Sequence, residues 1–300
     1  MAIWNLFFST LLLPLIGIAL LARKSGIPRG SWMATLILSG GLVGFSFFAA
    51  PWGWFGVPLR WLLALLFALA VVVSFRRRPE EELSDDGTPI NRGESPLRMM
   101  GKILIGLFFG SVAMGAISAR TQPARVLDLG VPIRGGTFLI AHGGSAPAAN
   151  VYAGHATQGF AVDFVKLNAI GARARGFQPD ELTSYAIFGT PVISPCDGVV
   201  VAAADGLPDK ISSVPDEKNA SGNQVVLRCG DAEVHLEHLQ RGSVSVKAGM
   251  NVPRGTPLGR VGSSGSSSEP HLHIYAIREG KALPMTFDGK WLVRNQTIRR

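Results

Sequence analysis

Four long apolar runs fill most of the first 120 residues and restrict what this chain can fold into. They cover residues 3–22, 31–50, 52–75 and about 103–119. Each is close to the roughly 20 residues that a helix needs to cross the hydrocarbon core of a bilayer. A segment in lipid must satisfy its own backbone hydrogen bonds, which a helix does. Residues 1–120 are therefore predicted to form an all-α transmembrane domain of four helices.

The first run has the flanks of a membrane span rather than those of a cleaved signal peptide. A signal peptide carries its basic residues before the apolar segment and a small-residue cleavage site after it. Here the basic pair Arg23-Lys24 follows the run. We therefore expect the first helix to be retained.

Basic residues beside the runs predict the orientation. Arg23, Lys24 and Arg29 follow the first run and residues 76–78 follow the third, whereas the turn between runs two and three is uncharged. Because cytoplasmic loops are enriched in Lys and Arg, residues 79–98 are predicted to be a cytoplasmic loop. Everything after about residue 120 is then extracytoplasmic. Much of the net charge of +8 lies in these clusters, so nucleic acid is not an expected partner.

The second half of the chain is punctuated by Gly, Pro, Asn and Asp, and its apolar runs are short. Runs of this length and spacing predict an antiparallel sheet or sandwich, with no long amphipathic helix. The expected strands cover residues 136–141, 160–165, 190–193, 198–202, 223–227, 233–238, 244–246, 257–261 and 271–277.

His271 and His273 stand at the start of the last of these strands, after a Gly/Ser-rich loop. Alternate side chains of a strand share a face, so both imidazoles should point the same way. Two converging imidazoles suit a metal site or a hydrolytic site. Two polar residues on the solvated face of a strand would give the same pattern, so both interpretations stay open at this point.

Several ordered motifs resemble the consecutive blocks of the lysostaphin/LytM-type zinc metallopeptidases. The resemblance extends over about residues 131–285. It implies a compact antiparallel β domain, one Zn²⁺ and cleavage of peptide bonds in bacterial peptidoglycan, so residues 121–300 are expected to be an exported β-rich zinc peptidase domain. The blocks are Gly189-Thr-Pro-Val-Ile-Ser-Pro-Cys-Asp-Gly, Gly222-Asn-Gln-Val-Val-Leu, Glu237-His-Leu, Gly255-Thr-Pro-Leu-Gly-Arg-Val-Gly and Pro270-His-Leu-His.

The resemblance also implies roles for individual residues. His273 and Asp163 correspond to zinc ligands, and His271 and His238 correspond to catalytic histidines. Three protein ligands would leave zinc an open position for water. His235, three residues before His238, is expected on the opposite face of its strand with a structural role.

The first zinc ligand is where the sequence departs from the family pattern. The family usually has a histidine four residues before the aspartate, and that position here is Gly159. A longer loop ending in Gln158-Gly-Phe-Ala-Val-Asp163 favours His155 as the ligand, with His142 as the main substitute. For Asn150 and Gln158 two interpretations stay open: a hydrogen bond to a ligand or to the substrate, or a role in the turn of the loop.

Cys196 and Cys229 both lie in the predicted exported half, where a disulfide is permitted. We expect buried free thiols, with a disulfide as the alternative, because pairing geometry cannot be read from sequence.

The sequence thus predicts a multi-pass protein of the bacterial cytoplasmic (inner) membrane that displays a zinc metalloendopeptidase on its outer side. Its predicted partners are the peptide of peptidoglycan, as substrate, and the lipid bilayer. The main alternative is a catalytically inactive binding or regulatory module of the same fold. A transport or signalling unit with a sensory β domain is disfavoured, because the spans contain few ionisable groups.

Overall fold

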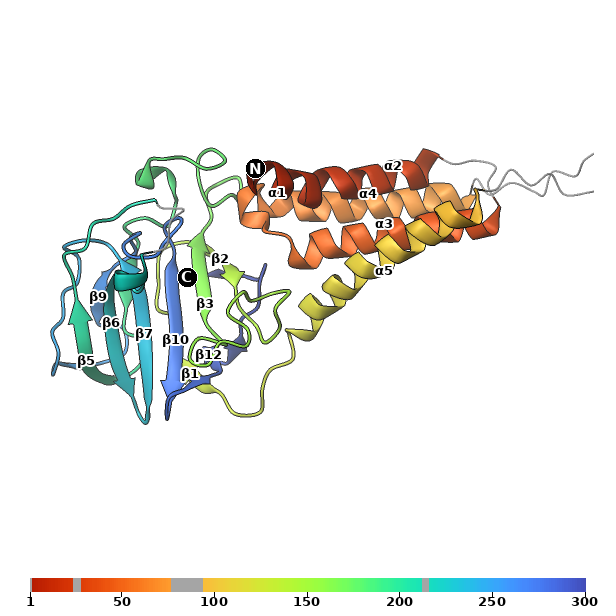
Figure 1. The fold of residues 1–300 in the computed structure, drawn as a ribbon. Helices are drawn as coiled ribbons and strands as arrows, with labels where there is room; N and C mark the ends of the chain where they lie inside the picture. Colours follow the sequence, from red (N-terminus) through yellow and green to blue (C-terminus); the bar gives the residue numbers. More distant parts are fainter. Residues whose placement is uncertain (1, 24–27, 77–93, 212–215) are drawn as a thin grey trace, which may run out of the picture. The chain divides into compact units, whose positions relative to one another are not determined.

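A computed structural model describes residues 2–23, 28–76, 94–211 and 216–300, and it divides into two compact units (Figure 1). One unit comprises residues 1–51 and 57–117, and the other comprises residues 52–56 and 118–300. The predicted cytoplasmic loop over residues 79–98 lies outside the described residues as far as residue 93. Its last residues belong to a helix that begins at Pro96.

The first unit is helical, as predicted. Four of its helical segments are long and apolar enough to cross a membrane: Trp4–Arg23, Arg29–Ala49, Val57–Arg76 and Pro96–Ser118. The third starts later than expected because residues 52–54 form a separate 3₁₀ turn, η2 (Trp52–Trp54). The elements are α1 (Ala2–Phe7), the π-helical η1 (Phe8–Leu12), α2 (Leu13–Arg23), α3 (Arg29–Ala49), α4 (Val57–Arg76) and α5 (Pro96–Ser118).

Two local features explain how these helices pack. Pro14 has no backbone N–H to donate to the carbonyl of Thr10, and the hydroxyl of Ser46 donates to that oxygen instead at 2.6 Å. Pro14 thereby accounts for the π-helical turn that precedes it. Farther along the unit, α3 and α5 cross where Gly41 meets Gly106, so closely that a Cβ on Gly106 would lie 2.5 Å from the carbonyl oxygen of Ile37.

The second unit is built on a nine-stranded, mainly antiparallel sheet (Figure 1). Its order is β14-β2-β3-β10-β7-β6-β5-β8, with β11 also paired to β10. The strands are β2 (Thr137–His142), β3 (Val162–Lys166), β5 (Gly198–Ala204), β6 (Asn223–Cys229), β7 (Ala232–Leu239), β8 (Asn251–Val252), β10 (Leu272–Arg278), β11 (Lys281–Leu283) and β14 (Thr297–Arg299).

Two smaller sheets complete the domain. One has the order β1-β12-β13, from β1 (Leu127–Leu129), β12 (Met285–Phe287) and β13 (Lys290–Trp291), and the other pairs β4 (Pro191–Ile193) with β9 (Pro257–Arg260). Their buried side chains join those of the large sheet in one hydrophobic core, which includes Phe287, Leu258, Phe164 and Ile274. The core therefore lies against one face of β3 and β10.

Two expectations for the strands and cysteines of this unit were wrong. Residues 244–246 are not a strand: the N–H of Ser245 donates to the carbonyl oxygen of Leu258 in β9 at 2.9 Å, but the N–H of Val244 donates to the carboxylate of Asp205 at 3.1 Å. Cys196 and Cys229 are not free thiols but form a disulfide, with their Cα atoms 5.9 Å apart. The sheet brings the start of β5 next to the end of β6, through the pairing of Val199 with Arg228.

Candidate metal centre and catalytic histidines

Three adjacent central strands bring the candidate site together. In the register of the sheet His273 of β10 lies opposite Asp163 of β3 on one side and Glu237 of β7 on the other. Leu272 and Ile274 are buried in the hydrophobic core, so His271 and His273 project from the opposite face of β10. The two imidazoles share a face, as predicted.

Asp163, His271 and His273 form the candidate metal centre. One potential ligand atom from each lies within 4.8 Å of those from the others. Nδ1 of His273 is 2.7 Å from Oδ1 of Asp163, and Nε2 of His271 is 3.9 Å from the same oxygen. The hydroxyl of Tyr152 donates to the second carboxylate oxygen, Oδ2, at 3.1 Å. Both oxygens of the Asp163 carboxylate are thus held in place by neighbouring side chains.

Electrostatics keep this buried carboxylate ionised. Burial raises the pKa of Asp163, but the adjacent His271 and His273 outweigh it and hold that pKa below its ordinary range. Burial lowers the pKa of His273, yet the carboxylate of Asp163 leaves it raised. An ionised carboxylate beside imidazole nitrogens is a donor set that suits Zn²⁺. The residues present therefore fit a zinc ion.

His238 reaches the site through an unusual backbone conformation. Its φ is +62°, in the left-handed region that non-glycine residues seldom adopt. Its ring lies 4.8 Å from that of His271 and 5.9 Å from that of His273. Nδ1 is 2.9 Å from the carbonyl oxygen of Ser264, so Nδ1 must carry the proton and Nε2 is left as an acceptor.

The predicted face of His235 was wrong, because the strand alternation breaks at His238. His235 lies opposite Tyr275 in the register of β7 and β10, and the two rings stack with centroids 4.5 Å apart. Tyr275 has the same parity as His273, so His235 lies on the same face as the candidate site. Counting back from His238 gave the wrong face because the regular alternation breaks at that residue.

The structure does not bring His155 to the cluster. His155 is exposed, and its Nδ1 accepts the backbone N–H groups of Thr157 at 3.3 Å and Gln158 at 3.2 Å. Asn150 has a loop role: its buried amide donates to the carbonyl oxygens of Gly144 and Ala161 at 3.0 and 3.2 Å. These bonds fix the loop that carries His155.

His142, the substitute ligand, lies much nearer to Asp163, its register partner across β2 and β3. Nη1 of Arg294 donates to Nδ1 of His142 at 3.2 Å, because a guanidinium can only donate. Burial lowers the pKa of His142 to about 4, so the ring is neutral and its one proton sits on Nε2. In this arrangement neither ring nitrogen offers a lone pair to a metal.

Glu237 and Tyr275 were missed by sequence reasoning. Both are buried, and the hydroxyl of Tyr275 donates to Oε1 of Glu237 at 2.9 Å. Burial, together with Glu237, raises the pKa of Tyr275, which therefore stays protonated as a donor. The strand alternation places them beside His273, but only the register of β7 with β10 identifies them as partners.

An ion pair behind the site holds the segment before His271. The guanidinium of Arg173 is buried and bonds the carboxylate of Glu269 at 2.9 and 2.6 Å. It also lies 3.7 Å from the ring centre of Trp54, which belongs to the same compact unit. The carbonyl oxygen of Glu269 in turn accepts the Nδ1 proton of His271 at 2.8 Å. In the neutral tautomer that this bond selects, Nε2 of His271 is the acceptor nitrogen, and it faces the cluster.

Comparison with known proteins gives a family match for part of the β domain. Residues 183–284 match peptidase family M23. The chain carries a peptidase family M23 domain. His238, His271 and His273 fall inside the matched residues, whereas Asp163 precedes them. The four apolar helices followed by a mostly antiparallel β domain are thus the fold that the sequence predicted.

Individual relatives match only about a third of the chain. The cell division protein DipM of Caulobacter vibrioides is 31% identical over 108 residues, which are 36% of this chain and 16% of that protein. The peptidoglycan DD-endopeptidase ShyA of Vibrio cholerae is 32% identical over 104 residues, 34% of this chain and 21% of that protein. The matched part thus spans about a fifth or less of these relatives.

Among solved structures, the M23 domain is similar to the catalytic domain of lysostaphin from Staphylococcus simulans. The two are 25% identical, with 43% of this chain and 78% of that chain covered and a TM-score of 0.27. A zinc-containing peptidase from Vibrio cholerae is 21% identical, with 51% and 37% covered and a TM-score of 0.32.

Proposed function

We propose that this chain is a membrane-anchored zinc metalloendopeptidase that hydrolyses peptide bonds of bacterial peptidoglycan. The observation that carries the proposal is the buried pair of Asp163 and His273, 2.7 Å apart, with His238 and His271 beside it. The similarity to ShyA, a peptidoglycan DD-endopeptidase, supports the choice of substrate.

Asp163 and His273 are the proposed zinc ligands. When bound, zinc would polarise the scissile carbonyl and lower the pKa of a water molecule. For the third ligand, His155 stays a prediction from the resemblance, whereas Nε2 of His271 is the nearest further nitrogen in the cluster. The zinc content of His155→Ala and of His271→Ala distinguishes the two, because only the substitution that removes a zinc ligand lowers the amount of bound zinc.

His238 and His271 are the proposed catalytic pair. Burial lowers the pKa of His238 well below its usual value, and the nearby His271 and His273 lower it further, so the ring is neutral at pH 7. Its free Nε2 can then accept a proton from the attacking water. His271 directs its Nε2 toward the same cluster, because its Nδ1 donates to the carbonyl oxygen of Glu269. One imidazole can take the proton while the other, once protonated, stabilises the oxyanion.

The proposed location is the outer side of the bacterial inner membrane. The asymmetry of the basic loops supports an extracytoplasmic β domain. The disulfide between Cys196 and Cys229 supports it independently, because disulfides persist in oxidising compartments and are rare in the cytosol. The four apolar helices would then confine hydrolysis to the wall close to the membrane.

The experiment uses the full chain in detergent, with purified peptidoglycan as substrate and zinc measured by mass spectrometry. Wild type should release soluble fragments and hold about one zinc per chain, and His273→Ala should lose both. His238→Ala should keep the zinc and lose hydrolysis. Full zinc loading without hydrolysis of peptidoglycan or of peptides would instead support the inactive binding module.

A further inference from the structure

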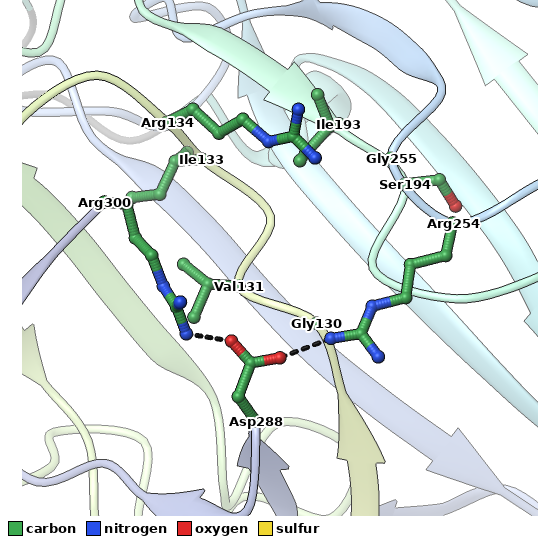
Figure 2. Close-up of a pocket in the computed structure, with 10 residues that line it drawn as sticks. All are labelled: Gly130, Val131, Ile133, Arg134, Ile193, Ser194, Arg254, Gly255, Asp288 and Arg300. Atoms are coloured by element: carbon green, nitrogen blue, oxygen red, sulfur yellow. Dashed lines mark hydrogen bonds and ion pairs between the residues drawn. The ribbon is translucent and has the colours of Figure 1, made fainter.

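The second unit contains a pocket of about 570 Å³ whose charged groups take no part in the site described above (Figure 2). Its walls come from the segment after β1, from the end of β4, from the turn before β9 and from the turn after β12. Val131 and Ile133 in its wall belong to the hydrophobic core. The candidate metal centre lies on the face of β3 and β10 that points away from that core, so the pocket is a separate location.

Three arginines and one aspartate supply the charge of this pocket. Asp288 bonds Arg254 through one carboxylate oxygen and Arg300 through the other, as Figure 2 shows. Arg134, on the opposite wall, has no ion pair among the described residues. The side chains therefore sum to a charge of +2, and a guanidinium on each wall retains donors for a ligand.

The backbone makes room for these guanidinium groups. A Cβ on Gly130 would lie 2.5 Å from Nε of Arg254, so any other residue there would displace that arginine. Gly255 has a φ of +91°, and its Cβ would press within 3.3 Å on Nη2 of Arg134. Two glycines thus leave the space in which the arginines face the pocket. Asp288 fixes Arg254 and Arg300 with charge-assisted bonds.

The chemistry of the walls indicates the ligand. Guanidinium forks bind carboxylate and phosphate oxygens in the same bidentate geometry. Val131 and Ile193 add a small apolar surface beside the charges, and a volume of this size accepts a small organic group rather than a bare ion. A membrane surface would instead contact a protruding basic patch.

We propose that this pocket binds the free carboxylate end of a short peptide with small aliphatic side chains. The carboxylate bonds Arg134 and the outward donors of Arg254 and Arg300, while the aliphatic groups contact Ile193 and Val131. Such an end belongs to the substrate class proposed above, so the pocket would hold one part of the substrate while another part is cut. The binding itself does not depend on zinc or on His273.

The test is a calorimetric titration of the full chain in neutral detergent with N-acetyl-alanyl-alanine. Its C-terminal amide, which lacks only the charge, is the matched ligand control. Arg134→Gln removes a guanidinium that is exposed and unpaired, so the fold should be unaffected. Arg241→Gln is the matched protein control, because Arg241 is also exposed and lines no part of the pocket.

The free acid should bind at millimolar concentration, and the amide should bind at least about tenfold more weakly. Arg134→Gln should weaken binding of the acid by about fivefold or more, while Arg241→Gln should leave it unchanged. Inorganic phosphate should compete with the peptide. His273→Ala should bind the acid like wild type, which separates this proposal from the proposed hydrolysis.

Four results would overturn the proposal. Equal binding of acid and amide would exclude recognition of the carboxylate, and an unchanged affinity in Arg134→Gln would exclude this pocket. Binding of phosphate without binding of the peptide would reduce the pocket to an inorganic anion site. Arg134-dependent binding to phosphatidylglycerol vesicles that the peptide does not inhibit would assign the pocket to lipid headgroups instead.

Discussion

Removal of the Cys196–Cys229 disulfide should destabilise the β domain by an amount that follows from the loop it closes. The two cysteines are 33 residues apart in the sequence. The chain-entropy relation for a loop of that length gives about 3.7 kcal/mol at 25 °C. Because Cys229 is buried in the hydrophobic core, replacing it by alanine adds a smaller packing loss.

The effect can be measured by pulse proteolysis of the full chain in lipid nanodiscs across a urea series. With a dependence of about 2 kcal/mol per molar urea for a domain of this size, the midpoint should fall by about 1.8 M in Cys196→Ala/Cys229→Ala. The urea midpoint of the single variant Cys229→Ala should fall nearly as far, since either substitution removes the whole cross-link.

A maleimide reagent provides the companion measurement. Neither thiol of the wild-type chain should react, under denaturing conditions, until a reductant is added. A midpoint within about 0.3 M of wild type in the double variant would refute the loop-entropy reasoning. Single variants that each lose half of the effect would refute the cross-link as its cause.

Other perturbations have equally definite expectations. Arg173→Ala leaves Glu269 without its partner behind the site and should cost about 3 kcal/mol, measured as a lowered thermal midpoint. Burial lowers the pKa of His235, so the folded domain loses stability as the pH falls below about 6.5, where the unfolded chain takes up the proton. His235→Phe should therefore reduce the loss of stability between neutral and acidic pH, measured by urea midpoints. Chelation should abolish hydrolysis of peptidoglycan and added zinc should restore it, while the circular dichroism of the β domain stays unchanged, because Asp163 and His273 bond each other without metal.

The sequence predicted the parts of this protein that follow from periodicity. Apolar runs of bilayer length predicted the four helices, and strand alternation correctly put His271 and His273 on one face. The strands expected over residues 160–165, 233–238 and 271–277 also correspond to β3, β7 and β10. These features are local, because each depends only on the pattern of a single segment.

Features that depend on long-range contacts were not predictable in this way. The face of His235 was wrong because His238 adopts a left-handed conformation that no pattern signals. Glu237 became a site residue only through the register of β7 with β10. The disulfide required two strand ends to meet across the sheet. The position of His155 depends on its loop, which the side chain of Asn150 closes by a hydrogen bond to the backbone of Ala161, 11 positions away.

The central position of β10 in the large sheet bears on how the proposed metal ligands are held when no ion is bound. β10 is hydrogen-bonded along both edges, to β3 and β7, so its amides should be among the slowest in the chain to exchange with solvent. The proposed ligands Asp163 and His273 are anchored on these strands and keep their mutual geometry without an ion. If zinc binds as proposed, it can leave and return while the domain remains folded.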